Sequence, residues 1–202
     1  MATPGKQARD AYDDDLPMRE ALQTYFQANG FAQDGGYAAK FVRVQIGPLA
    51  FFVPNTKARQ RLLPFHDVHH VVTGYRTTPV GEAEIGAWEL ASGCSQFRTA
   101  WFLNGMAFSL GCVLDPGAVQ RAWARGRRTR NAYLLNYQSD LIDKPVAQVK
   151  RELGTHEPDP PLTPEDRATF RKAALVFLGA CGVPAVLAYA APPALLLWWW
   201  LA

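Results

Sequence analysis

The sequence predicts an all-α protein, a compact multi-helix domain with a metal-binding helical hairpin and a hydrophobic C-terminal membrane segment. Three observations support this fold class. Helix-capping and helix-ending residues recur along the chain, apolar residues between them repeat at helical spacing, and no charged residue follows residue 172. With 202 residues, 49% of them hydrophobic, the chain is long enough for one domain with a sizeable core.

Composition limits the classes of function. The net charge of +3, from 21 basic and 18 acidic residues, gives no indication of nucleic-acid binding. Cys94, Cys112 and Cys181 are too widely spaced for a C-x-x-C motif, so we expect reduced, buried thiols. Residues 1–17 are polar and are expected to be a disordered N-terminus, neither a signal peptide nor a mitochondrial transit peptide. These features favour a bacterial protein on the cytoplasmic side.

The helical metal-binding domain is expected to span residues 18–155. Its first element, residues 18–30, is predicted to be a short amphipathic helix that ends at Asn29-Gly30. Residues 31–56 have the composition of a strand pair. Within an all-α fold, however, we expect helix and loop there.

Three of the four histidines lie in the next stretch, His66-Asp67-Val68-His69-His70. Pro64 is expected to open a helix here, because proline is favoured in the first helical turn. At about 100° per residue, His66, Asp67 and His70 share one arc of that helix, and His69 falls outside it. Two imidazoles at positions i and i+4 are the usual way in which a helix offers two nitrogens to one metal ion.

A turn rich in glycine, threonine and proline follows, and a second helix is predicted to begin at Pro79 with Thr78 as its N-cap. If the two helices pack antiparallel, the first turn of the second meets the last turn of the first. Glu82 then lies beside His70. Glu89 lies two turns beyond Glu82 on the same face. There it could form a hydrogen bond to a metal-binding side chain from outside the ligand set, or act as an alternative ligand.

The candidate metal ligands are therefore His66, Asp67, His70 and Glu82, a nitrogen and oxygen set that suits zinc or another divalent ion. A histidine pair at i and i+4 is by itself more often surface decoration. The carboxylate placed across the turn favours a metal site. Asp67 has an alternative role, because its position next to His66 would also let it orient a ring nitrogen from outside the ligand set.

Two helices are expected after the hairpin. The apolar stretch 95–114 is either the wall of a prenyl-binding tunnel or, as we favour, a buried core helix. Asp115-Pro116 should start the next helix, about residues 116–137, which carries five arginines with Trp123 and Tyr133. Three interpretations of these arginines are open: a site that binds an anion, a helix face that lies on a membrane surface, or an ordinary solvated helix face. An anion site and a solvated helix start are likewise both open for three earlier basic residues, Lys57, Arg59 and Arg61.

The last part of the chain divides into three. Residues 143–153 are predicted to form a short helix, and residues 156–164 a Pro-rich linker in which His156 is incidental. Residues 165–202 are predicted to be a hydrophobic membrane anchor, since the uncharged positions 173–191 would give about 28 Å of helix. An anchor lying in the membrane plane and a buried core helix are the alternatives, in that order.

The metal motif resembles a known family signature. His66-Asp67-x-x-His70, followed by Glu82 after eleven residues, is similar to the H-D-x-x-H-x11-E signature of the coenzyme Q (ubiquinone) biosynthesis protein 4 family. The surrounding sequence HDVHHVVTGYRTTPVGEAEIGAWELASG is similar too, and weaker similarity extends through RAWARGRRTRNAY and DKPVAQVKRELG. The hydrophobic C-terminus after residue 172 departs from the family pattern.

The resemblance implies an all-α fold and a divalent metal, usually zinc, on His66, Asp67, His70 and Glu82. It implies a metal-dependent lyase of ubiquinone biosynthesis that removes the C1 carboxylate of a polyprenylated benzoate ring, coupled to oxidation. The expected partners are that ring intermediate or another prenyl lipid, the membrane and other quinone-biosynthesis proteins. The expected place is the cytoplasmic face of a bacterial inner membrane. Arg127 is a guess for the residue that holds the anionic group of the substrate.

Two other classes of function are weighed against this one. The first is a non-catalytic lipid-binding scaffold of the quinone-biosynthesis complex, in which the metal is only structural. The second is a metal hydrolase, which is disfavoured because Asp67 is one methylene shorter than the glutamate of zinc peptidases. In addition, nucleotide phosphohydrolases with a His-Asp pair need a further upstream histidine, and this chain has none before His66. The sequence leaves open the metal, the tail length and whether the chain forms homo-oligomers.

Overall fold

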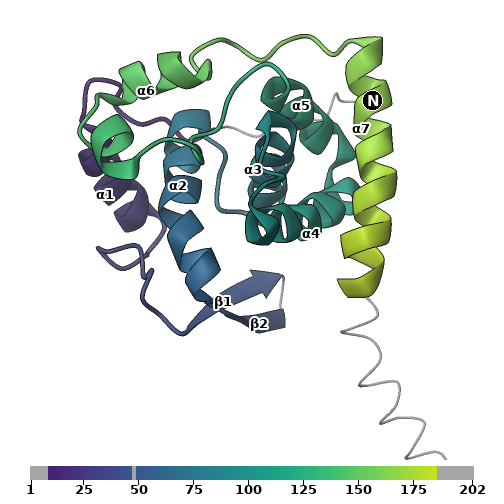
Figure 1. The fold of residues 1–202 in the computed structure, drawn as a ribbon, viewed down its shortest axis with the longest axis horizontal. Coiled ribbons are helices and arrows are strands. Elements are labelled where there is room, and N and C mark those ends of the chain that lie inside the picture. Colours follow the sequence, from purple (N-terminus) through teal and green to yellow (C-terminus); the bar gives the residue numbers. More distant parts are fainter. Residues whose placement is uncertain (1–8, 47–48, 186–202) are drawn as a thin grey trace, which may run out of the picture.

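The computed structural model of the chain describes residues 9–46 and 49–185, and over these residues the protein is mostly helical, as predicted (Figure 1). The α-helices are α1 (Met18–Ala28), α2 (Lys57–Thr73), α3 (Pro79–Ser92), α4 (Arg98–Leu114), α5 (Pro116–Gly126), α6 (Val146–Leu153) and α7 (Pro164–Phe177). Two π-helical segments, η1 (Tyr137–Ile142) and η2 (Leu178–Gly182), and a hairpin of β1 (Phe41–Ile46) and β2 (Leu49–Pro54) complete the fold.

The helices pack in two groups, each around its own apolar cluster. In Figure 1, α1, α2 and α6 lie on one side, and α3, α4, α5 and α7 lie on the other. The first cluster takes its buried residues from α1, α2, η1 and α6. The second takes them from α3, α4, α5, α7 and η2, with Trp88 and Phe108 fully buried in it. The metal motif lies where the groups meet, because its histidines belong to α2 and Glu82 belongs to α3.

The first helix and the short helix α6 are confirmed. Helix α1 buries Met18, Leu22, Tyr25 and Phe26 and ends at Asn29. Helix α6 buries its predicted apolar stripe, which consists of Val146, Val149 and Leu153 together with Leu141 of η1. Both helices show that apolar residues at helical spacing predict the buried face of an amphipathic helix.

The prediction of helix and loop for residues 31–56 is wrong for residues 41–46 and 49–54. These residues form two antiparallel strands in which Phe41 is opposite Pro54 and Ile46 is opposite Leu49. Both strands are rich in β-branched and aromatic residues, which favour extended backbone. The strand-pair composition was thus the better guide, and the all-α class holds only for the rest of the described chain.

Two predicted helix boundaries are also wrong. Helix α2 begins at Lys57, with the Thr56 side chain accepting the Arg59 N–H, so Pro64 lies inside the helix and does not open it. Lys57, Arg59 and Arg61 therefore belong to the helix that carries the histidines. Helix α5 starts at Pro116 with Asp115 as its cap, as predicted, but it ends at Gly126 and not near residue 137.

The residues before α1 are held against the domain from residue 9 onward. The Asp10 N–H donates to the Gly74 carbonyl, and its carboxylate pairs with Arg76. Arg9 binds both oxygens of Asp159 in the segment after α6. The disorder expected over residues 1–17 therefore does not describe residues 9–17, while residues 1–8 lie outside the described part.

Helix α7 is attached to the domain by one face. Phe170, Ala173, Phe177 and Cys181 join the second apolar cluster, and the Phe177 and Cys181 side chains pack so tightly on Gly105 that any Cβ there would clash. Residues 165–181 are therefore packed on the domain, whereas the predicted division placed them in a separate membrane anchor.

The opposite face of α7 is exposed although it is apolar, with Leu175 77% and Val176 55% accessible. By length and composition, Pro164–Ala185 is the one helix of the described residues that could cross a membrane. Residues 186–202, the rest of the predicted anchor, lie outside the residues that the structure describes.

Candidate metal centre

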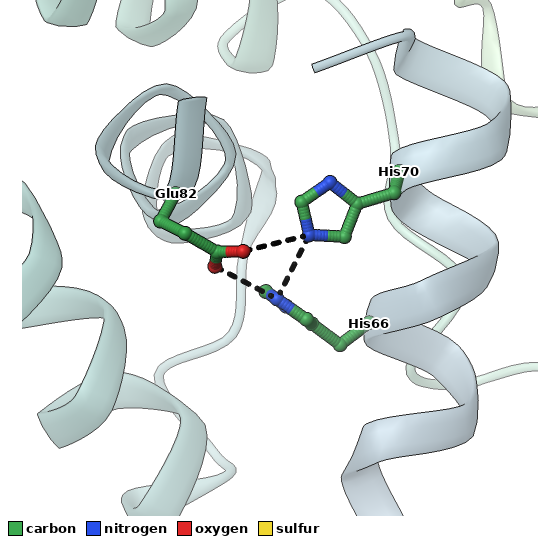
Figure 2. A group of neighbouring side chains, drawn as sticks. All are labelled: His66, His70 and Glu82. Carbon is green, nitrogen blue, oxygen red and sulfur yellow. Dashed lines mark hydrogen bonds and ion pairs between the residues drawn. The ribbon is translucent and has the colours of Figure 1, made fainter. Parts of the chain in front are cut away.

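His66, His70 and Glu82 bring three ligand atoms together between α2 and α3 (Figure 2). The two Nε2 atoms are 3.2 Å apart. Glu82 places Oε2 3.4 Å from His66 Nε2 and Oε1 3.5 Å from His70 Nε2. Ligands bound tetrahedrally at zinc distances lie about 3.3 Å from one another. Each histidine nitrogen therefore lies at about this spacing from the other and from one oxygen of the Glu82 carboxylate.

The local sequence explains why Glu82 reaches the histidines. Gly74 ends α2 in the left-handed conformation, at φ 75°, and Thr78 caps α3 by accepting the Gly81 N–H. A Cβ at position 81 would run into the Arg76 carbonyl, so only glycine lets the turn pass this close to the first turn of α3. The predicted cap and the predicted placement of Glu82 beside His70 are thus both found.

The hydrogen bonds of the two rings direct their Nε2 atoms to the centre. His70 Nδ1 is 2.7 Å from the Tyr75 carbonyl oxygen, which can only accept, so Nδ1 carries the proton. His66 Nδ1 is 2.9 Å from Glu89 Oε1, where the same reasoning applies to an ionised carboxylate. Neutral His66 and His70 therefore point two Nε2 lone pairs and the Glu82 carboxylate at one another. A backbone carbonyl or a carboxylate behind the ring is the usual support of a metal-binding histidine.

Electron-rich nitrogen and oxygen atoms at these distances repel one another unless they share a proton or a metal ion. Burial alone would lower the pKa of His66, but the carboxylates of Glu89 and Glu82 hold it well above its usual value. A proton on His66 Nε2 can therefore bridge the group, and a divalent ion can replace it. His70 is buried, whereas the side chains of His66 and Glu82 are 21% and 40% exposed. A fourth position would thus face the solvent, as in catalytic zinc sites.

Asp67 lies outside this group, although it was predicted as a ligand. Its Oδ1 accepts a hydrogen bond from the Tyr25 hydroxyl at 3.3 Å, and its Oδ2 accepts one from the Tyr37 hydroxyl at 2.7 Å. Its carboxylate thus ties α2 to α1 and to the segment before β1. Among the described residues, the group of side chains that could hold a metal consists of His66, His70 and Glu82.

Glu89 and His69 form the layer behind the centre. Glu89 is fully buried, and its Oε1 also lies 2.7 Å from His69 Nδ1. His69 Nε2 accepts the Ala132 N–H at 2.9 Å, so both of its nitrogens are occupied. His69 is therefore excluded as a ligand, as its place on the helix predicted, and Glu89 supports His66, which was one of its two predicted roles.

Sequence reasoning missed two partners of Glu89, Asn104 and Tyr133. Asn104 of α4 donates to Glu89 Oε2 at 2.5 Å, and the Tyr133 hydroxyl donates to the same oxygen at 2.6 Å. Asn104 is a single polar residue in an apolar helix, and this alone could have marked it as a buried hydrogen-bonding position. Tyr133 follows α5, and no local pattern connects it with Glu89.

The guess that Arg127 holds an anionic substrate finds no support in its contacts. Its guanidinium is paired with Glu165 and with Asp166, at 2.5 Å and 2.7 Å, at the start of α7. Other arginines of the same stretch also bind the protein itself: Arg125, Arg128 and Arg130 donate to Thr73, Asp166 and Glu152.

A different basic site lies between the first turns of α2 and α4. A hollow of about 310 Å³ is lined there by Arg59 and Arg98 together with apolar side chains that include Phe102 and Leu103. Arg59 donates to the amide oxygen of Asn55 at 3.3 Å. Its burial lowers its pKa by more than the charges of Glu82 and Asp67 raise it. A partly buried guanidinium without a close carboxylate is suited to bind an anion.

Comparisons with models of protein families, with curated proteins and with solved structures find no match for this chain.

Proposed function

We propose that the protein binds a divalent metal ion, zinc in the first place, through His66, His70 and Glu82. The observation that carries the proposal is the convergence of two Nε2 atoms, 3.2 Å apart, on the Glu82 carboxylate, whose Oε2 lies 3.4 Å from His66 and whose Oε1 lies 3.5 Å from His70. Both rings are held from behind at Nδ1. Two histidines and one carboxylate with an open fourth position are the ligand set of catalytic zinc.

Charge balance supports a divalent ion. Glu82 and Glu89 bring two negative charges to the centre, and none of the four hydrogen-bond partners of Glu89 carries a permanent positive charge. A buried ionised carboxylate is unfavourable unless a positive charge compensates it. A metal of charge +2 would balance Glu82 and Glu89 together, whereas a proton on His66 balances only one of them.

We further propose that the metal serves a reaction on a polyprenylated benzoate ring in ubiquinone biosynthesis. This part rests on the similarity of the His66-Asp67-x-x-His70 and Glu82 motif to the coenzyme Q biosynthesis protein 4 family. In the proposed step the bond between C1 and its carboxylate breaks, carbon dioxide leaves and a proton takes its place. A hydroxyl group at C1 instead requires a two-electron oxidant from a partner protein or from dioxygen.

The metal would supply Lewis-acid polarisation of a ring oxygen or of the carboxylate. The chain itself would orient the substrate. The hollow beside Arg59 and Arg98 offers guanidinium groups for an anionic group, and Phe102 offers an apolar surface for the ring or the prenyl tail. Arg59 lies seven residues, or two turns, before His66 on the same face of α2, so an anion held there would lie along the helix from the metal.

The membrane association is a separate part of the proposal. The helical stretch Pro164–Ala185 exposes Leu175, Val176 and Val183, and Arg171 and Lys172 lie just before them. An apolar helix face next to basic residues can lie in the plane of a membrane surface. Because the other face of α7 packs on α4 and α5, the described contacts favour an in-plane anchor over a helix surrounded by lipid.

The function is tested by mass spectrometry of quinones and their precursors in a strain of the source organism that lacks the chain. We expect a ring-carboxylated prenyl intermediate to accumulate, and we expect rescue by the wild type and not by His70→Ala. His156→Ala is the matched control, since His156 is exposed and pairs with Glu157 outside the centre.

The other outcomes overturn parts of the proposal. Rescue by His70→Ala would reject the metal-dependent lyase and would favour a scaffold that only binds lipid and partner proteins. An unchanged quinone profile in the deletion strain would remove the protein from this pathway.

A further inference from the structure

Glu89 is a buried carboxylate that serves two histidines with one oxygen. Its Oε1 lies 2.9 Å from His66 Nδ1 and 2.7 Å from His69 Nδ1. Its Oε2 accepts hydrogen bonds from Asn104 and Tyr133. The four partners come from α2, α4 and the segment after α5, so Glu89 joins the metal centre to α4 and to the segment after α5.

We propose that Glu89 is the positioning residue of the metal centre, which holds the His66 ring so that Nε2 faces His70 and Glu82 before any metal binds. The inference rests on the proposed metal site but concerns a residue outside the ligand set. Glu89 touches neither the metal position nor the substrate, and it acts through His66 alone.

The hydrogen bond at Nδ1 decides what His66 can do at Nε2. A neutral imidazole carries one proton, and if it sat on Nε2 the lone pair needed for a metal would be lost. An acceptor at Nδ1 holds the proton there and stops the ring from turning about its χ2 bond. His66 needs this restraint more than His70, because its side chain is 21% exposed and that of His70 is 1% exposed.

His69 shows the same carboxylate used for a different purpose. Its Nδ1 also points to Glu89 Oε1, but its Nε2 accepts the Ala132 N–H. The Glu89 carboxylate therefore presents one ring to the metal and uses the other to fix the segment that carries Tyr133. Tyr133 in turn donates to Glu89 Oε2, which closes the ring of contacts around the carboxylate.

The substitution Glu89→Gln separates charge from shape. An amide oxygen can keep the two histidine contacts, while the Asn104 amide turns over and the Tyr133 hydroxyl rotates to accept from the new NH2 group. The variant should therefore fold but hold His66 less firmly, since a neutral acceptor forms weaker hydrogen bonds than a carboxylate. Asp166→Asn is the matched control, because Asp166 is also a fully buried carboxylate but its partners Arg127, Arg128 and Thr163 lie outside the metal centre.

Two measurements test the inference, both on the full chain. Zinc affinity is measured by competition with a chromophoric chelator, and the ligand field is measured from the visible spectrum of the cobalt(II) form. We expect Glu89→Gln to weaken zinc binding about 10- to 100-fold and to change the cobalt spectrum. Asp166→Asn should leave both unchanged. Wild-type affinity and spectrum in Glu89→Gln would overturn the inference, as would an equal loss in Asp166→Asn.

A third measurement, by nuclear magnetic resonance, needs no metal. In the metal-free protein, the His66 Nδ1–H should be protected from exchange with water, and nuclear magnetic resonance should show faster exchange in Glu89→Gln than in the wild type or Asp166→Asn. An unprotected His66 Nδ1–H in the wild type would overturn the positioning role. A protected one in a protein that binds no zinc would overturn the proposed metal function and leave the positioning role standing.

Discussion

Glu89 and Asp166 are both fully buried carboxylates, but they are compensated in different ways. Asp166 accepts from Arg127 at 2.7 Å and from Arg128 at 2.8 Å, and it forms a capping box with Thr163 at the start of α7. Two cations therefore balance its charge. Glu89 is held by histidine, asparagine and tyrosine donors, which satisfy its oxygens and bring no permanent positive charge.

The difference separates a structural carboxylate from one that serves a site. Asp166 is complete within the protein, because its partners fix α7 and neutralise it. Burial alone would raise the pKa of Glu89, but His66 and His69 hold it well below its usual range. Its charge therefore acts on the histidines and favours a cation at the centre beside it. The comparison supports the proposed cation site next to Glu89, whereas the arginines already balance Asp166.

The largest expected effect is the loss of stability in Glu89→Ala. This change leaves His66, His69, Asn104 and Tyr133 without a buried acceptor, which should lower the free energy of unfolding by about 3–5 kcal/mol. Urea unfolding at pH 7 measures it. Asp166→Ala is the comparison, and we expect a smaller loss of about 1–2 kcal/mol, because Arg127 and Arg128 can turn to solvent when their partner is removed. The reverse order of the two losses would contradict the contrast.

A smaller effect is expected in the acid range. Hydrogen bonds from Arg128 and from Thr163 hold the pKa of Asp166 below its usual range despite its burial. A group with a lowered native pKa contributes stability that is complete above its unfolded value, about 3.9, and is lost as the pH falls towards the native value. The stability advantage of the wild type over Asp166→Asn should therefore be constant from pH 5 to 7 and shrink below about pH 4.

Urea unfolding of both proteins at several pH values measures this advantage. A difference that grows on acidification would show that the Asp166 carboxylate is not stabilised by its arginine and threonine partners.

The smallest expected effect concerns Asp67→Asn. The Asp67 carboxylate binds Tyr25 and Tyr37 and not the metal group, so we expect zinc affinity to fall by less than the roughly 10-fold that marks a support of a metal ligand. The chelator competition used for Glu89→Gln measures it. A loss of zinc affinity as large as that caused by replacing a ligand such as His70 would mean that Asp67 is a ligand, as the motif implied.

Much of the candidate site could be predicted because its geometry is local. His66 and His70 are one helical turn apart, and Thr78, Pro79 and Gly81 fix where α3 starts, so Glu82 falls beside His70 once the first turn of α3 meets the last turn of α2. The same holds for the helices α1 and α6, whose buried faces follow from helical spacing of apolar residues. In these cases neighbours in the chain decide the structure.

The rest depends on contacts between distant segments. Asp67 shares the arc of the histidines, but Tyr37, thirty residues earlier, draws its carboxylate away. Arg127 was a candidate for an anionic substrate, yet Glu165 and Asp166 neutralise it from the start of α7. The apolar residues of α7 suit a membrane helix equally well, and only the packing of Phe170, Ala173 and Phe177 in the second apolar cluster shows that one face belongs to the domain. No periodicity in the sequence contains this information.

Zinc binding to the metal-free chain tests the central claim most directly. Titration of the wild type and of His70→Ala, with His156→Ala as the control and circular dichroism to confirm folding, gives the stoichiometry and the affinity. The account predicts one zinc ion per chain in the wild type and in His156→Ala, and loss of that site in folded His70→Ala. A wild type that binds no zinc, or a His70→Ala variant that binds it with unchanged affinity, would contradict the account.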